Sequence, residues 1–240
     1  MGCVTNNTAT DRPLHQAPTA LIFDWDNTLV DSWATIHEAL AVTFTHFGHK
    51  PWSMDEVKDQ VRQSLRDSFP HYFGDKWEEA RDIYLGNFEA IHLERCKPLA
   101  GASELLNRMT HEWGLPAGIV SNKTGRLLRK EVDYLGWSAH FVSVLGAGDA
   151  VSDKPNPAPV EIIRKELTSP EAHNIWFVGD TDIDMACAHH SDCRAILIHP
   201  ALATDGAPTH LNDLNGWSLD HHFQNIDEMA EYLATLIKTE

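Results

Sequence analysis

The stretch LIFDWDNTLVDS, residues 21–32, places three aspartates directly behind an apolar run. Residues 20–23 (ALIF) are typical of a buried strand, because the strands of parallel sheets are continuously apolar. Asp24 and Asp26 follow this strand, and open α/β sheets bind their ligands beyond the carboxyl ends of the strands. An acidic loop alone is ordinary, since aspartate is common in turns. Whether this loop belongs to a ligand-binding site therefore depends on which residues follow the other strands.

Four further apolar runs are typical of buried strands: AGIV (117–120), HFVSVL (140–145), IWFV (175–178) and AILI (195–198). Helical patterns separate these runs. Ser103 is expected to cap one helix, a second helix follows Thr124, and a third begins after Pro159. This alternation predicts an α/β fold, a Rossmann-like parallel sheet with helices on both faces.

Residues 33–97 show helical periodicity throughout and no convincing strand. Ser53 and Glu56 form a capping-box pattern ahead of one helix, whose apolar spacing continues through Val61 and Leu65. We therefore expect an all-helical cap domain at residues 33–97, inserted after the first strand. The core domain would comprise residues 18–32 and 98–240. Residues 1–17, which are polar and aperiodic, would form a loose N-terminal tail.

Composition limits the possible partners. The 19 basic and 35 acidic residues give a net charge of −16, which makes a nucleic acid an improbable partner. No apolar run approaches the 18 or so residues of a membrane span, so no membrane partner is expected. The four cysteines form no CxxC pair and no signal peptide is recognisable, which indicates a cytoplasmic protein. The oligomeric state stays open.

Three other strand ends also carry polar groups. Ser121 and Asn122 follow AGIV, Lys154 lies in the loop after HFVSVL, and Asp180 and Asp184 follow IWFV. Parallel strands bring all these ends to one edge of the sheet. Clustered carboxylates repel one another unless a cation keeps them ionised, and oxygen ligands without Cys or His suit Mg²⁺.

A phosphate group is the natural substrate for such a site. Lys154 and the Ser121 hydroxyl can stabilise its oxygens. An aspartate beside the metal can attack phosphorus and form an aspartyl phosphate. Asp24 and Asp26, two positions apart in an extended segment, point the same way and can address opposite ends of one P–O bond.

Four segments carry a family resemblance: DWDNTLVDS (24–32), VSNK (120–123), DKPNP (153–157) and GDTDIDMACA (179–188). Their order and spacing resemble the four motifs of the haloacid dehalogenase superfamily. The helical insertion resembles the C1 cap of its phosphoglycolate-phosphatase-like branch. The match spans roughly residues 20–200. It implies a Mg²⁺-dependent phosphatase that hydrolyses a small phosphorylated metabolite, a phosphomonoester.

The resemblance also implies roles for individual residues. Asp24 would be the nucleophile, and Asp26 the acid that protonates the leaving group and then the base that activates water. Thr28 would orient this motif by hydrogen bonding. Ser121 and Lys154 would hold the phosphoryl oxygens.

The magnesium site implied by the resemblance comprises the Asp24 carboxylate, the Asp26 backbone carbonyl and Asp180. Asp184 would contribute indirectly or through water. Asn122, beside Ser121, is expected to join it in binding substrate.

Other positions carry weaker expectations. The family usually has Gly where this chain has Asn27, so a positive φ is expected there. Arg62 and Arg66 could bind an anionic substrate tail, although a solvated helix face is the alternative. Lys123 is ambiguous, because the resemblance implies a supporting position behind the site, whereas a surface position is the commoner one for a lysine.

Three neighbours of the motifs have structural expectations. Asp153 and Asp182 are expected to make loop hydrogen bonds. Trp25 should point away from the two aspartates beside it and pack.

Two alternatives to a phosphatase remain. A phosphosugar mutase of the same family also keeps the second aspartate. A non-catalytic member could bind a phosphorylated ligand or a protein, but such proteins tend to lose the nucleophile or the acid. Asp24, Asp26, Ser121, Lys154 and Asp180 are all present, which favours catalysis.

Overall fold

The computed structural model describes residues 16–167, 174–200 and 214–238. At its centre is a six-stranded sheet with the strand order β5-β4-β1-β6-β7-β8. All neighbouring strands are parallel. The predicted parallel sheet is therefore confirmed, with β1 near its middle. The strands are β1 (Ala20–Phe23), β4 (Ala117–Thr124), β5 (Ser143–Ala147), β6 (Ile175–Gly179), β7 (Arg194–Ile198) and β8 (His221–Phe223).

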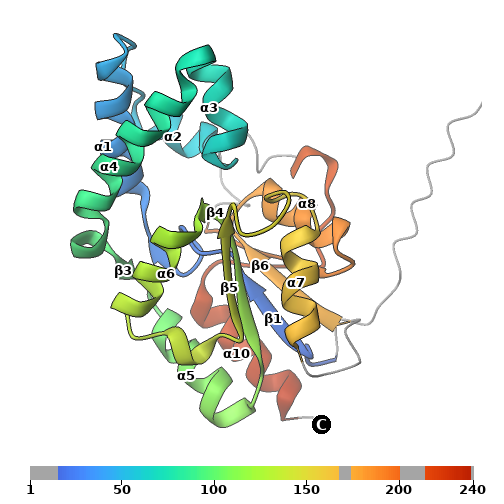
Figure 1. The fold of residues 1–240 in the computed structure, drawn as a ribbon. Coiled ribbons are helices and arrows are strands. Elements are labelled where there is room, and N and C mark those ends of the chain that lie inside the picture. Colours follow the sequence, from blue (N-terminus) through green and yellow to red (C-terminus); the bar gives the residue numbers. More distant parts are fainter. Residues whose placement is uncertain (1–15, 168–173, 201–213, 239–240) are drawn as a thin grey trace, which may run out of the picture.

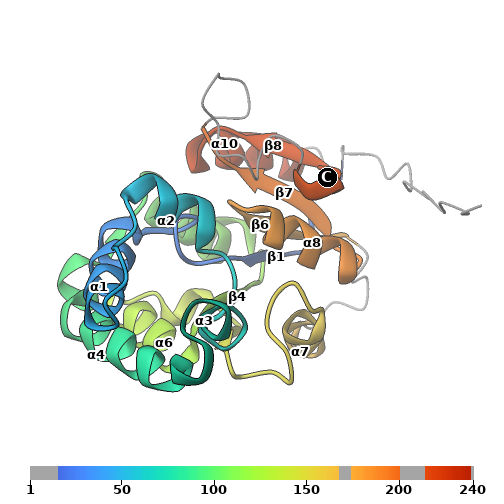
Figure 2. The ribbon, with the colours of Figure 1, turned by 90° about the horizontal axis from the view of Figure 1, so that it is seen from above.

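Helices cover both faces of this sheet (Figures 1 and 2). Successive residues of a strand point to opposite faces. Leu21 and Phe23 accordingly pack in one apolar cluster with α5, α6 and α10, whereas Ala20 and Ile22 pack in another with α7 and α8. The helices are α5 (Ala102–Arg108), α6 (Gly125–Tyr134), α7 (Ala158–Glu166), α8 (Asp182–His190) and α10 (Ile226–Ile237).

Several element boundaries differ from the sequence-based predictions. Strand β5 begins at Ser143, because residues 138–140 form a 3₁₀ turn. Ser103 does not cap α5, since Gly101 precedes the helix with φ at 81°. Pro159 lies within the first turn of α7, a position where its missing N–H costs no helical hydrogen bond. Strand β8, which is only three residues long, was not predicted.

Four helices form one block between β2 (Val30–Asp31) and β3 (Lys97–Pro98). We call this block the helical insert: α1 (Trp33–His46), α2 (Met54–Gln60), α3 (Leu65–Phe73) and α4 (Trp77–Arg95). Strands β2 and β3 are antiparallel neighbours, with Val30 opposite Pro98 and Asp31 opposite Lys97. The chain thus enters and leaves the insert through two adjacent segments.

The capping box predicted at the start of α2 is present, with Ser53 and Glu56 bonded to each other's backbone N–H groups. The helix ends at Gln60, however, and Val61 is extended. A second helix begins at Leu65, so the apolar spacing from Val57 to Leu65 belongs to two helices instead of one.

The insert lies over the carboxyl ends of the strands (Figure 1). Its apolar core includes Phe44, Phe69 and Phe88, and it also takes in Leu127 from α6 of the sheet layer. Within the described ranges, no helix is both long enough and apolar enough to cross a membrane. The tail expected at residues 1–17 lies almost wholly outside the described residues.

Candidate active site

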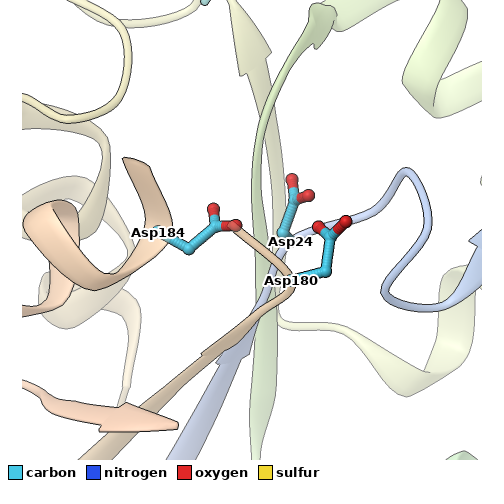
Figure 3. Close-up of side chains that lie close together, drawn as sticks. All are labelled: Asp24, Asp180 and Asp184. Carbon is cyan, nitrogen blue, oxygen red and sulfur yellow. The ribbon is translucent and has the colours of Figure 1, made fainter. Parts of the chain in front are cut away.

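Three buried aspartates meet at the carboxyl edge of the sheet. Asp24 follows β1, Asp180 follows β6 and Asp184 lies in the first turn of α8, and one carboxylate oxygen of each lies within 4.8 Å of the others (Figure 3). The Asp24 backbone N–H donates to the carbonyl of Val178 at 2.8 Å, so the β1–β6 pairing continues to the site. Parallel pairing therefore brings together acids that lie far apart in the sequence.

These carboxyl groups are held away from water, which disfavours their charged forms. Burial raises the pKa of Asp24 to about 6, against the lowering effect of Lys154 and with smaller contributions from Asp184 and Asp26. Burial, and then the charges of Asp184 and Asp24, also raise the pKa of Asp180 well above its usual range. Burial thus disfavours the ionised carboxylates, and positive charge beside them would offset that effect.

Lys154 supplies part of that charge. Its side chain is buried, and its Nζ lies 2.6 Å from Asp24 Oδ1 and 2.7 Å from Asp184 Oδ1. Burial opposes the charged ammonium, but Asp184 and Asp24 outweigh it, so the pKa of Lys154 is raised. Lys154 is therefore charged and adjacent to Asp24.

Asp184 also has a local structural role. Its Oδ2 accepts hydrogen bonds from the backbone N–H and the hydroxyl of Thr181, at 3.0 and 2.7 Å. This interaction caps the start of α8. With Oδ1 bonded to Lys154, both oxygens of Asp184 have protein partners.

The turn after β1 is set by Asn27, whose φ is 62°. The predicted positive φ is confirmed. Asn27 also accepts a hydrogen bond from the Ser32 N–H at 3.2 Å. Thr28, fully buried one position later, donates from its hydroxyl to Asp180 Oδ1 at 3.2 Å. This hydrogen bond ties the turn to the neighbouring strand end.

Of the two positions left open for Lys123, the surface position is wrong. Its Nζ is buried and lies 2.6 Å from both Asp26 Oδ1 and Glu131 Oε2. Glu131, on α6, also accepts from the indole N–H of Trp25 at 2.6 Å and lies 2.7 Å from His92 Nδ1 on α4. A buried network therefore connects Asp26 to the helical insert.

Sequence reasoning missed Glu131 and His92, although a signal existed. Glu131 occupies a helical position among Leu127, Leu128 and Val132, all buried, and so does His92 after Phe88. A charged residue on an apolar stripe is rarely buried without a partner. Trp25 is fully buried and packs against the edge of Trp137, as predicted.

Ser121 and Asn122 lie at the end of β4, where the pairing with β5 becomes irregular. Ser121 is buried and lines the cleft described next. The Asn122 amide donates to the backbone carbonyls of Arg62 at 2.9 Å and Lys154 at 3.1 Å. Asn122 thereby joins the helical insert to the loop that carries Lys154.

A cleft that is partly open to solvent lies between the sheet edge and the helical insert. Asp24, Asp26, Ser121, Lys154 and Asp180 all line it, so the structure brings these predicted residues into one space. Asn122 lines it as well, whereas Thr28 and Asp184 lie behind the lining.

The two arginines of the insert differ in position. Arg62 lines the cleft and Arg66 does not. Arg62 Nη1 lies 3.0 Å from Asp182 Oδ1, and Arg66 Nε lies 2.6 Å from Asp153 Oδ2. Asp153 also makes the expected loop hydrogen bond, to the Gly148 N–H. Both aspartates therefore bridge the sheet layer and the insert, which was not predicted.

A parallel sheet with an acidic cluster at its carboxyl edge and a helical insert above it defines a class of hydrolases. The haloacid dehalogenase-like hydrolase family matches residues 21–198, and the chain belongs to that family. The resemblance seen in the four motifs is confirmed.

Individual relatives show which hydrolases of this family the chain is similar to. A phosphoglycolate phosphatase from Cereibacter sphaeroides is 26% identical over 232 residues, covering 90% of this chain and 98% of the relative. One from Aquifex aeolicus is 28% identical over 181 residues, covering 74% and 83%. A haloacid dehalogenase superfamily hydrolase of known structure, from Ehrlichia chaffeensis, superposes with a TM-score of 0.61 at 25% identity, covering 92% of this chain and 98% of that one.

Proposed function

We propose that this chain is a Mg²⁺-dependent phosphatase that hydrolyses a small phosphomonoester through an aspartyl phosphate on Asp24. The observation that carries this proposal is the convergence of Asp24, Asp180 and Asp184 within 4.8 Å, with Lys154 against Asp24. Two relatives named phosphoglycolate phosphatase support it.

The first half of the reaction uses Asp24 and Asp26. A carboxylate oxygen of Asp24 attacks phosphorus, and the bond between phosphorus and the ester oxygen breaks. Asp26 gives its proton to that oxygen, which leaves as an alcohol. Ser121, Asn122 and Lys154 orient the phosphoryl group, and Lys154 offsets its negative charge. Arg62 and Arg66 stay as predicted substrate contacts.

The second half regenerates Asp24. Asp26, now a carboxylate, takes a proton from a water molecule whose oxygen attacks phosphorus. The bond between phosphorus and Asp24 breaks, and inorganic phosphate leaves. Lys123, whose Nζ lies 2.6 Å from Asp26 Oδ1, positions the Asp26 side chain in this step.

The residues at the sheet edge fit Mg²⁺. Their donors are oxygens, and burial and the neighbouring carboxylates raise the pKa values of Asp24 and Asp180, an effect that a bound cation would offset. The carboxylates of Asp24 and Asp180 and the Asp26 carbonyl would hold the ion, with Asp184 supporting the site from behind. When bound, Mg²⁺ stabilises negative charge on the phosphoryl oxygens.

Residues 33–97 would act as the cap domain, above a core of residues 18–32 and 98–240. The cap would exclude water from the first step and so confer specificity. We further propose that the enzyme acts in the cytoplasm on a small phosphorylated metabolite. The experiment has to distinguish this phosphatase from the two alternatives, a phosphosugar mutase and a non-catalytic binding protein.

The test is a screen of phosphomonoesters with the purified protein and Mg²⁺. We expect release of inorganic phosphate, and Asp24→Asn should abolish it while leaving the circular dichroism spectrum intact, because the side chains are nearly isosteric. Asp31→Asn, at an exposed aspartate of β2, is the matched control and should retain activity.

Three results would contradict the proposal. Wild-type activity in Asp24→Asn would exclude Asp24 as the nucleophile. Conversion of one sugar phosphate to another faster than phosphate release would indicate a mutase. Binding of phosphomonoesters without turnover under any divalent metal would indicate a non-catalytic protein.

A further inference from the structure

Asp26, the acid and base of the proposed reaction, is held by one of its two carboxylate oxygens. Its Oδ1 lies 2.6 Å from the Nζ of Lys123, and its side chain lines the cleft. Among the described residues, Lys123 is the hydrogen-bond partner of this carboxyl group, and Oδ2 has none. Oδ2 is therefore the oxygen that can exchange a proton with the leaving group and with water, and the contact with Lys123 determines where it lies.

Lys123 needs a second partner to define that position. A lysine ammonium sits on a flexible four-carbon stem and can donate in several directions. The Nζ of Lys123 also lies 2.6 Å from Glu131 Oε2, and it lies over the ring of Phe88, 4.9 Å from the ring centroid. The Glu131 carboxylate thus gives the ammonium a fixed anionic partner besides Asp26, and the position of Lys123 depends on it.

The same oxygen of Glu131 also holds the backbone beside Asp26. The indole N–H of Trp25 donates to Glu131 Oε2 at 2.6 Å, and Trp25 is fully buried. Trp25 directly precedes Asp26 in the chain. Glu131 therefore acts on Asp26 in two ways, through the neighbouring residue and through Lys123.

His92 of the helical insert holds the other oxygen of Glu131. Its Nδ1 lies 2.7 Å from Glu131 Oε1, and both side chains are buried. Burial opposes the ionised form of Glu131, but the charge of Lys123 and the hydrogen bonds outweigh burial and lower its pKa. Because a carboxylate can only accept, the Nδ1 of His92 is the donor. Both oxygens of Glu131 are thus fixed, one of them from the insert.

We propose that Glu131 is a positioning residue for Asp26, that it acts through Lys123, and that His92 holds it from the helical insert. This inference rests on the proposed phosphatase activity and adds the residues that orient its acid-base group. Without Glu131, the ammonium of Lys123 would no longer be fixed, and Oδ2 of Asp26 would lose its alignment with the departing oxygen. The loss should therefore fall on the step in which Asp26 gives its proton.

The test uses the full chain with Mg²⁺ and two substrates that differ in their need for an acid. The leaving oxygen of 4-nitrobenzyl phosphate becomes an alcohol and needs the proton of Asp26, whereas 4-nitrophenolate is a stable anion that can leave without one. For both substrates, kcat/KM covers the steps up to departure of the leaving group. The ratio of the two values does not depend on the fraction of folded enzyme, so a loss of stability alone leaves it unchanged.

Glu131→Gln should lower kcat/KM for 4-nitrobenzyl phosphate about tenfold more than kcat/KM for 4-nitrophenyl phosphate. This is part of the roughly 100- to 10,000-fold that a positioned acid contributes. Glu94→Gln, at an exposed glutamate of α4, is the control and should leave both values unchanged. An unchanged ratio in a folded Glu131→Gln would overturn the inference while leaving the phosphatase assignment in place. Absence of all turnover by the wild-type chain would overturn both.

A double-mutant cycle tests whether Glu131 acts through Lys123. Lys123→Met removes the ammonium and keeps an unbranched side chain. In this background, Glu131→Gln should no longer change the ratio of the two kcat/KM values, because residues that act through one contact are not additive. A further tenfold change in the double variant would show that Glu131 acts by another route.

Two variants of His92 test the contribution of the insert and leave the contact between Lys123 and Glu131 in place. His92→Leu removes the donor to Glu131, and His92→Asn keeps an N–H donor near the position of Nδ1. The ratio should shift in His92→Leu in the same direction as in Glu131→Gln, and His92→Asn should restore it. Equal ratios in the two variants would exclude His92 from the positioning. If Glu131→Gln fails to fold, this pair decides the inference.

Discussion

Glu131 shows how one buried residue organises others around it. Its two carboxylate oxygens face Trp25, Lys123 and His92, which come from three different parts of the chain. Burial alone would raise the pKa of Glu131, but the charge of Lys123 and the three hydrogen bonds outweigh burial and lower it. Glu131 therefore stays ionised in the interior and stabilises the fold through its partners.

Replacing Glu131 with Gln should destabilise the protein by about 3 kcal/mol at neutral pH, because it leaves the buried Lys123 with Asp26 as its single anionic partner. The measurement is urea-induced unfolding followed by tryptophan fluorescence. Since the pKa of Glu131 is lowered by folding, its contribution is complete above the unfolded value of 4.5 and is lost as the pH falls below it.

The difference between wild type and Glu131→Gln should therefore shrink in acid. Glu94→Gln, at an exposed glutamate of α4, serves as the control and should change stability by less than about 0.5 kcal/mol. A cost for Glu131→Gln as small as that of the control would show that the network contributes little.

At the scale of elements, β6 and α8 approach each other closely beside the site. A Cβ placed on Gly179 would lie 2.3 Å from Asp184 Cβ, so the strand end and the helix start approach closely enough to require glycine. Asp184 in turn caps α8 and holds Lys154. The geometry of Lys154 thus depends on the lack of a side chain at Gly179.

Gly179→Ala should force Asp184 away from Lys154. We expect a loss of about 1–3 kcal/mol of stability and a clear drop in kcat. Thermal unfolding and steady-state kinetics measure the two effects. Gly86→Ala is the matched control, since a Cβ at this exposed position of α4 meets no atom within 4 Å.

In the control, the higher helix propensity of Ala should raise stability by up to about 1 kcal/mol without changing kcat. Wild-type kinetics in Gly179→Ala would show that Lys154 does not need its contact with Asp184.

At the scale of the whole molecule, three pairs join the sheet layer and the helical insert: Arg62 with Asp182, Arg66 with Asp153 and His92 with Glu131. Figure 2 shows the insert beside the strand ends, opposite α7 and α8. The charges of the aspartates at the sheet edge therefore affect both the sheet layer and the helical insert. Burial raises the pKa of Asp24 to about 6, and the charges of Asp184 and Asp26 add smaller contributions.

Mg²⁺ should stabilise the protein more strongly at pH 8 than at pH 5. Without metal, the raised pKa values of Asp24 and Asp180 lower stability as the pH rises from their unfolded value of 3.8 through the folded values. Binding requires deprotonated carboxylates and removes this cost. At a hundredfold excess over Kd, the gain is about 3 kcal/mol, or roughly 6–12 °C in Tm.

Differential scanning fluorimetry with and without Mg²⁺ tests this prediction. Asp180→Asn should lose most of the shift, whereas Asp31→Asn should keep it. Equal shifts at both pH values, or a full shift in Asp180→Asn, would contradict a carboxylate site at this edge.

The sequence alone predicted much of this protein because its signals are local or periodic. Apolar runs indicated five strands, and the polar groups that follow them indicated the ligand edge. The positive φ of Asn27 was predicted from the family resemblance, because the family usually has Gly at that position. Boundaries were less certain, as with α2 and α3, since helical spacing does not show that Val61 is extended.

Only the tertiary structure decided the partners of the charged residues. Lys123 looks like a surface lysine until α6 brings Glu131 against it, and Arg62 looks like a free cation until Asp182 is placed opposite. Such pairings join residues that are distant in the chain, and they depend on how layers pack, which no local pattern encodes. The strand pattern therefore determined where the site is, and the packing of the insert determined which charges remain for a ligand.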